Sequence, residues 1–296
     1  MWKELLEAVV SGNIRALARA ISLTENEVNG YGELLLSLPV SSTPVIGITG
    51  PPGAGKSTIT DGLIGAFTDA GKRVAVICVD PSSPFNFGAL LGDRIRMSQW
   101  YQHPGVYIRS LASRGSLGGL NPKIIEITDV VRAAGFDLII IETVGVGQSE
   151  VEIAGLADVT AVVVVPEAGD EVQTMKAGLM EIADVFVVNK SDRPDADLFV
   201  RNLKLMLAPA FQRQDAEIPV MKTVAATGQG VPELAKVLFE RATAIQQHPR
   251  RFHLLAEKAW QLIQQQRMRG ISKSTLRDAI VAEGETFNLY RFIQKF

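Results

Sequence analysis

The chain has 296 residues, of which 47% are hydrophobic, so it can bury a core of ordinary size for a globular protein. Thirty Lys and Arg residues against 32 Asp and Glu residues leave a formal net charge of −2, and neither sign forms a long run. The charge distribution therefore gives no reason to expect nucleic acid or a membrane surface as a partner.

A single cysteine, Cys78, excludes an internal disulfide and a cluster of thiolate metal ligands. It lies in the apolar stretch VAVICVD, where a small core residue of a strand is expected. The first residues, MWKELLEAVVSGNIRALARAI, place charged residues such as Glu4 and Arg15 among the apolar ones, unlike a signal peptide or a membrane span. We expect a soluble, cytoplasmic protein.

Residues 1–44 are predicted to form an N-terminal helical extension and a linker. Apolar residues recur at helical spacing in two stretches, which indicates two short amphipathic helices separated near Asn29-Gly30. The Ser- and Thr-rich stretch between Pro39 and Pro44 is typical of a connection.

Residues 45–247 are predicted to form the main domain, in which short apolar runs alternate with helical stretches. The expected strands are 45–49, 74–79, 106–109, 138–141, 160–165, 185–188 and 220–223. Most of these runs are continuously apolar, which indicates burial of both faces of the sheet. The fold class expected is therefore α/β, a mostly parallel sheet with helices on both faces, whose ligand lies beyond the carboxyl ends of the strands.

The residues after Gly230 are predicted to be helical over 231–247, 252–268 and 273–283. Residues 248–296 would form a C-terminal helical extension. Its apolar side chains, including Trp260 and Ile263, could pack on the main domain or on a second copy of the chain.

A phosphate-binding motif follows the first predicted strand. Residues 50–58 read GPPGAGKST, which matches the P-loop between a strand and a helix. In that motif backbone N–H groups face the phosphate oxygens, Lys56 reaches the terminal phosphates and the Ser57 hydroxyl is placed for Mg²⁺. The nucleotide-binding residues expected here are Gly50, Pro51, Pro52, Gly53, Ala54, Gly55, Lys56, Ser57 and Thr58.

A second motif predicts which base the nucleotide carries. The run 185–188 leads into Asn189-Lys190-Ser191-Asp192, and the Asp192 carboxylate can accept two hydrogen bonds from the ring N–H and the amine of guanine. Adenine presents a lone pair at that ring nitrogen, so the pattern favours GTP over ATP. Asn189 is expected to bond the base and the loop, and the Lys190 stem to lie along the base. Further backbone contacts to guanine are expected from Ala225, Ala226 and Thr227.

Acidic residues in three loops are candidates for the metal side of the site. Asp80 and Glu142 end predicted strands and are suited to hold Mg²⁺, and Asp93 could reach the metal or the attacking water. Gly145 is the candidate for sensing the γ-phosphate. Gln148, Arg94 and Arg96 are candidates for placing water and stabilising charge.

Several longer stretches carry a family resemblance. Together with GPPGAGKST, the stretches VDPSS, LGDRIRM, ETVGVGQSEVEI and PEAGDEVQTMKAGLMEIADVFVVNKSD resemble the MeaB/ArgK family of P-loop GTPases. These metallochaperones serve adenosylcobalamin-dependent acyl-CoA mutases and include the human methylmalonic aciduria type A protein. The resemblance runs from about residue 45 to 230.

The resemblance implies slow GTP hydrolysis, binding to a mutase, and control of cofactor loading or removal by the nucleotide state. It also implies a homodimer, for which the C-terminal extension is a candidate dimerisation arm. It assigns the phosphate lysine to Lys56, the magnesium ligands to Ser57, Asp80, Asp93 and Glu142, and the base-reading carboxylate to Asp192. It further implies a loop over 166–176 that couples the mutase to the GTPase through Asp170, Gln173 and Lys176.

One departure and two alternatives remain open at this point. After VDPSS the family usually has a basic residue, Thr and paired glycines, whereas this chain has Pro84-Phe85-Asn86-Phe87-Gly88, which leaves the partner surface open. A P-loop kinase acting on a small molecule or a transport protein is the first alternative, although the guanine motif argues against it. A nickel-delivery GTPase is the second, although His103, His248 and His253 are widely spaced.

Overall fold

The computed structural model of the protein describes residues 1–80, 97–113, 120–143, 149–168, 177–211, 218–245, 250–284 and 287–296. Within them one parallel sheet has the order β3-β2-β4-β1-β5-β6-β7. Its strands are β1 (Val45–Thr49), β2 (Val74–Asp80), β3 (Val106–Ala112), β4 (Leu138–Glu142), β5 (Val159–Val164), β6 (Val185–Val188) and β7 (Val220–Lys222). The expected α/β class is confirmed.

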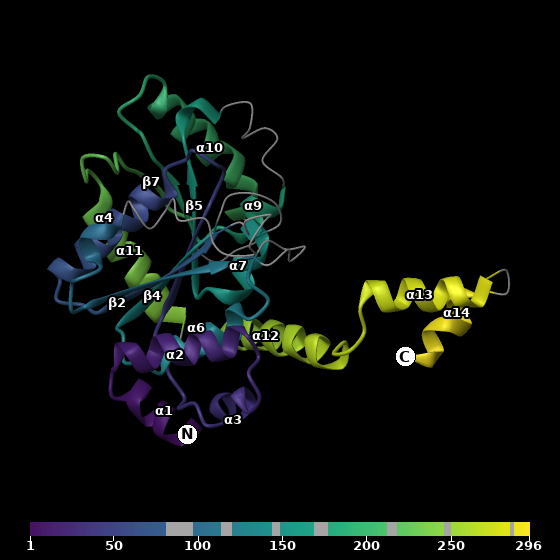
Figure 1. The fold of residues 1–296 in the computed structure, drawn as a ribbon. Coiled ribbons are helices and arrows are strands. Elements are labelled where there is room, and N and C mark those ends of the chain that lie inside the picture. The colour runs from purple at the N-terminus through teal and green to yellow at the C-terminus, as the bar shows by residue number, and fades with distance from the viewer. Residues whose placement is uncertain are drawn as a thin grey trace. The chain divides into compact units, whose positions relative to one another are not determined.

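Helices follow the strands and cover both faces of the sheet (Figure 1). The helices of this part are α4 (Lys56–Asp69), α6 (Ile124–Arg132), α7 (Ser149–Leu156), α9 (Ala177–Ile182), α10 (Ala196–Phe211) and α11 (Val231–Ala244), with short 3₁₀ turns η1 (Ser98–Trp100) and η2 (Pro166–Ala168). Strand β1 lies at the centre between β4 and β5. The loop after β1 is therefore surrounded by the loops of its neighbours, which is where such sheets bind ligands.

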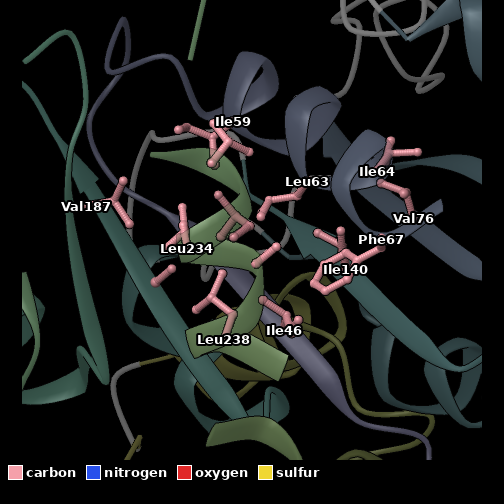
Figure 2. Close-up of a cluster of buried hydrophobic side chains, with 14 of the residues drawn as sticks. Ile46, Ile59, Leu63, Ile64, Phe67, Val76, Ile140, Val187, Leu234 and Leu238 are labelled. Carbon is pink, nitrogen blue, oxygen red and sulfur yellow. The ribbon is translucent and has the colours of Figure 1, made fainter. Parts of the chain in front are cut away.

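The alternation of side chains along each strand divides the core between two helix layers. Val185 and Val187 of β6 face the cluster formed with α4 and α11, where Leu63 and Leu234 meet the sheet (Figure 2). Phe186 and Val188 point the other way and pack with α10. Because both layers are apolar, most of the strands are apolar on both faces, as the sequence pattern predicted.

Three aspartates fasten the amino edge of the sheet. Asp137, Asp158 and Asp184 each stand directly before a strand, namely β4, β5 and β6. Each carboxylate accepts a backbone N–H from the neighbouring strand or the residue before it: Arg73 at 2.7 Å, Val45 at 2.8 Å and Thr160 at 2.8 Å, respectively. These charge-assisted bonds fix the register of the strands at the edge opposite the ligand loops.

Replacing Asp158 with Ala should lower the free energy of unfolding by about 1.5–3 kcal/mol, because the buried carboxylate bonds both the Val45 N–H and the Arg132 guanidinium. Urea denaturation would measure this loss as a lower midpoint concentration at an unchanged m value. Asp197→Ala is the matched control, since that carboxylate is exposed and pairs with Lys222 on the surface. Equal stability of the two variants would contradict the role given to Asp158.

The N-terminal extension differs from its prediction in the number of helices. Instead of two helices separated near Asn29-Gly30, the structure has three: α1 (Trp2–Val10), α2 (Ile14–Glu25) and α3 (Tyr31–Leu36). The additional break follows from Gly12, whose φ is +82°, and from Asn13, whose side chain accepts the Ala16 N–H at 3.0 Å and caps α2. Helix α2 then packs against α6.

The chain divides into two compact units, Met1–Leu254 and Leu255–Phe296. Helix α12 (Arg250–Arg267) crosses the division, and the second unit also contains α13 (Lys273–Glu283), α14 (Leu289–Phe292) and the turn η5 (Ile293–Lys295). Within this unit the rings of Phe287, Phe292 and Phe296 pack in series, and Lys295 pairs with Glu283. In the described part of the chain, no helix has the length and apolarity needed to cross a membrane.

Candidate functional site

The loop between β1 and α4 is built on glycines with positive φ. Gly50, Gly53 and Gly55 have φ values of +138°, +77° and +91°, and a Cβ at position 50 would lie 2.1 Å from the Val163 carbonyl oxygen. Only glycine adopts these conformations at little cost, so the loop curls and α4 begins directly after it, at Lys56. The N–H groups that open a helix then face the loop, which is the geometry of an anion site.

The Lys56 side chain is buried within this loop. Its Nζ donates to the carbonyl oxygens of Gly50 at 2.8 Å and Pro51 at 3.1 Å. The chain therefore holds the ammonium group against the backbone of the loop, where it can meet the charge of a bound phosphate.

Next to the loop, a hydroxyl and a carboxylate lie in contact. Ser57 Oγ donates to Glu142 Oε1 at 2.6 Å, and both residues are buried. The pairing follows from the sheet, because Glu142 ends β4 opposite Ile48 of β1. Both groups are oxygen donors of the kind that Mg²⁺ prefers, so the donor set fits that cation. Among the described residues no group of three or more His, Cys, Asp and Glu side chains is arranged so that it could hold a metal ion.

Asn189 joins three loops at the carboxyl edge. Its Nδ2 donates to the Ala54 carbonyl oxygen at 2.9 Å, and its Oδ1 accepts from Thr223 Oγ1 at 3.2 Å and from the Ala225 N–H at 3.1 Å. Asn189 is buried, so these bonds are shielded from water. We predicted that this amide bonds the base as well as the loop. The structure gives it three protein partners, which connect the loops that follow β1, β6 and β7.

The phosphate loop and the second motif line one pocket of about 240 Å³. Lys190, with φ of +56°, extends its Nζ to the Gly53 carbonyl oxygen at 2.9 Å, so its stem bridges the two loops. Asp192 is exposed at this pocket and makes no hydrogen bond or ion pair toward the described residues. The lining residues are Gly55, Thr58, Asn189, Lys190, Asp192, Arg193, Val224, Ala225 and Ala226.

Other predicted site residues are placed elsewhere or not described. Thr227 does not line the pocket, and its hydroxyl donates to the Val224 carbonyl oxygen at 3.1 Å within its own turn. Strand β2 includes Asp80, whose side chain lies outside the described part. The predicted residues outside the described ranges are Phe85, Asn86, Phe87, Asp93, Arg94, Arg96, Gly145, Gln148, Asp170, Gln173 and Lys176.

Arg193 was missed by the sequence reasoning, although it lines the pocket and directly follows Asp192. Its position next to Asp192, the carboxylate predicted to read the base, was the only signal available. The partner of its side chain, Glu167, is 26 positions away in sequence and could not be read from spacing.

Replacing Gly55 with Ala should weaken nucleotide binding by roughly tenfold or more. A Cβ there would lie 2.4 Å from Asn189 Nδ2 and would displace this amide from its hydrogen-bond partners. Gly53→Ala is the matched control: φ is also positive, but a Cβ would meet nothing within 4 Å. Calorimetric titration with GDP would compare them. Equal losses in both variants would place the effect in backbone strain and not in Asn189.

Comparison with known proteins places these motifs in a family. The sequence profile of the methylmalonyl Co-A mutase-associated GTPase MeaB matches residues 17–282. The chain belongs to the MeaB family. A protein of Pyrococcus horikoshii that is named as a GTPase is 46% identical over 260 residues, which are 86% of this chain and 81% of that protein.

Two further similarities extend this picture. The fused isobutyryl-CoA mutase of Geobacillus kaustophilus is 38% identical over 235 residues, 74% of this chain but only 22% of that longer protein. A solved structure titled LAO/AO transport system kinase covers 99% of this chain, with 95% of its own length, at a TM-score of 0.71 and 24% identity, and so supports the fold alone. As a member of the MeaB family, the protein is a GTPase that binds guanine nucleotide and hydrolyses GTP.

Proposed function

We propose that the protein is a GTP-hydrolysing chaperone that gates cofactor loading or repair of an adenosylcobalamin-dependent acyl-CoA mutase. The observation that carries this proposal is the relative in which a sequence similar to this chain is fused to an isobutyryl-CoA mutase. The family description, which names association with methylmalonyl-CoA mutase, points to the same class of partner. A separate chain would then do by binding what the fusion does by covalent linkage.

In this proposal the site residues divide the work of phosphoryl transfer to water. Lys56 and the N–H groups of the loop hold the phosphates and offset the negative charge that gathers in the transition state. Ser57 and Glu142, with Asp80 and Asp93, would hold Mg²⁺, and the cation would supply positive charge beside the nucleotide phosphates. Asp93 and Glu142 would also orient the attacking water. Gly145 would sense the γ-phosphate through its N–H.

The same proposal assigns the binding of guanine to the second motif and to the loop after β7. Asp192 accepts hydrogen bonds from guanine, the Lys190 stem lies along the ring, and the Ala226 N–H faces the guanine oxygen. The Ala225 N–H, which was also predicted to contact guanine, is instead donated to Asn189 Oδ1. Asn189 keeps these groups at fixed distances from the phosphate loop through its bonds to Ala54 and Ala225. Discrimination against adenine follows from the hydrogen-bond pattern of Asp192.

Partner coupling and assembly complete the proposal. Asp170, Gln173 and Lys176 would transmit the binding of the mutase to the GTPase site. The C-terminal extension, residues 248–296, would act as the dimerisation arm of a cytoplasmic homodimer. Trp260 and Ile263, exposed in the single chain, supply apolar surface for such an arm.

The test is GTP hydrolysis with and without a purified acyl-CoA mutase. Lys176→Ala should keep basal hydrolysis near the wild-type rate and lose most of the stimulation by the mutase, whereas Lys204→Ala, at an exposed position of α10, should keep both. Absence of stimulation and of complex formation with all acyl-CoA mutases tried would overturn the proposal. Faster transfer of labelled phosphate to a protein or small acceptor than to water would instead favour a kinase.

A further inference from the structure

Arg193 stands at a position where it could interfere with base recognition. It directly follows Asp192, and both residues line the pocket between the phosphate loop and the second motif, which we call the base pocket. A guanidinium can pair with the carboxylate of an adjacent residue, and the same chain contains such a pair: Arg277 donates to Asp278 Oδ1 through Nη2 at 2.9 Å and through Nε at 3.1 Å. An Arg193–Asp192 pair would occupy the oxygens that guanine needs.

The structure gives Arg193 a different partner. Its Nη1 donates to Glu167 Oε1 of the turn η2, which follows β5. The two loops lie side by side because the Asn189 N–H donates to the Val164 carbonyl oxygen at 2.8 Å, only three residues before Glu167. The hydrogen bond from Arg193 lowers the pKa of Glu167, so this carboxylate is ionised at neutral pH and can retain the guanidinium.

We propose that Glu167 is a positioning residue for guanine recognition, because it holds the Arg193 guanidinium at the wall of the base pocket and away from the Asp192 carboxylate. The ion pair itself is surface-exposed, with side chains 45% and 49% accessible, so it adds little to folding stability. Its value lies in the alternative pair that it prevents. Asp192 consequently presents both oxygens to the base, because the competing ion pair within the protein does not form.

This inference rests on the proposed role of Asp192 in reading guanine, and it makes a distinctive prediction for a pair of variants. Removing the charge with Glu167→Gln releases Arg193, which then pairs with Asp192 and competes with the exocyclic amine of guanine. Removing the guanidinium as well, in Glu167→Gln/Arg193→Ala, takes away the competitor and leaves Asp192 available again. A double substitution that restores what a single one loses is not expected of a purely structural contact.

The experiment measures calorimetric Kd values for GDP and for inosine diphosphate, which lacks the exocyclic amine. The Kd for inosine diphosphate divided by the Kd for GDP reports how fully Asp192 engages guanine. Glu167→Gln should lower this ratio by roughly two- to fivefold, the range for one competing exposed charge pair. The double variant and Arg193→Ala should both keep the wild-type ratio. Asp197→Asn, which breaks the exposed pair with Lys222 outside the pocket, is the matched control.

An unchanged ratio in Glu167→Gln would overturn the inference, and so would a lowered ratio that the double variant does not restore. If the wild-type protein binds both diphosphates equally, then Asp192 does not read the amine, and the base-reading assignment fails together with this inference. If the wild-type protein discriminates but Glu167→Gln leaves the discrimination intact, only the role of Glu167 fails.

Discussion

Lys56→Ala is expected to lower kcat for GTP hydrolysis by roughly 10²- to 10³-fold, the usual cost of losing a group placed where transition-state charge develops. The ammonium is held inside the loop by its bonds to the Gly50 and Pro51 carbonyl oxygens. That arrangement spares the site a reorganisation during the reaction. Single-turnover hydrolysis at saturating GTP and Mg²⁺ would measure the loss.

The control for this variant has to separate catalysis from folding, because Lys56 is buried. Thermal unfolding of the nucleotide-free variant reports whether the loop still folds, and Lys222→Ala removes an exposed lysine that forms a surface pair with Asp197. We expect normal hydrolysis in Lys222→Ala. A well-folded Lys56→Ala protein with activity within about threefold of wild type would contradict the electrostatic role.

Asp192→Asn is expected to weaken GTP binding by roughly 10²-fold and to improve binding of xanthosine triphosphate. The carboxylate accepts from the ring N–H and the amine of guanine, whereas the Asn amide offers one acceptor and one donor. Xanthine carries an oxygen in place of the amine, so the donor of Asn meets an acceptor. Competition binding of the two triphosphates against a fluorescent GDP analogue would measure the change in preference.

Asp195→Asn is the matched control for this change. Asp195 is an exposed aspartate three residues further along the chain, with φ of +63°, a conformation that Asn tolerates well, and it does not line the pocket. We expect this variant to keep the wild-type preference for guanine. Unchanged preference in Asp192→Asn would remove the argument for base reading by this carboxylate.

The sequence predicted the sheet well because its strands are buried on both sides. The runs 45–49 and 185–188 coincide with β1 and β6, since a continuously apolar run bounded by polar loop residues leaves little choice of ends. The edge strand β3 was predicted only over 106–109 and in fact extends to Ala112, through the polar residue Ser110. Propensity at an edge is a weaker signal than burial at the centre.

The site was predictable where a motif dictates backbone geometry and unpredictable where contacts join distant loops. The glycines at 50, 53 and 55 were assigned from the motif alone, and their positive φ values follow from it. The three bonds of Asn189 and the pair of Arg193 with Glu167 depend on how β5, β6 and the loop after β7 meet, which no local pattern encodes. The carboxylate contact of Ser57 likewise depends on the register of β1 with β4.

The aspartates at positions 137, 158 and 184 all act at the edge of the sheet remote from the nucleotide pocket. The bonds that fix the register of the strands and the residues that line the pocket therefore lie at opposite ends of the same strands. A substitution that breaks one of these carboxylate bonds is therefore expected to lower the free energy of unfolding more than it alters the binding of nucleotide at the opposite edge.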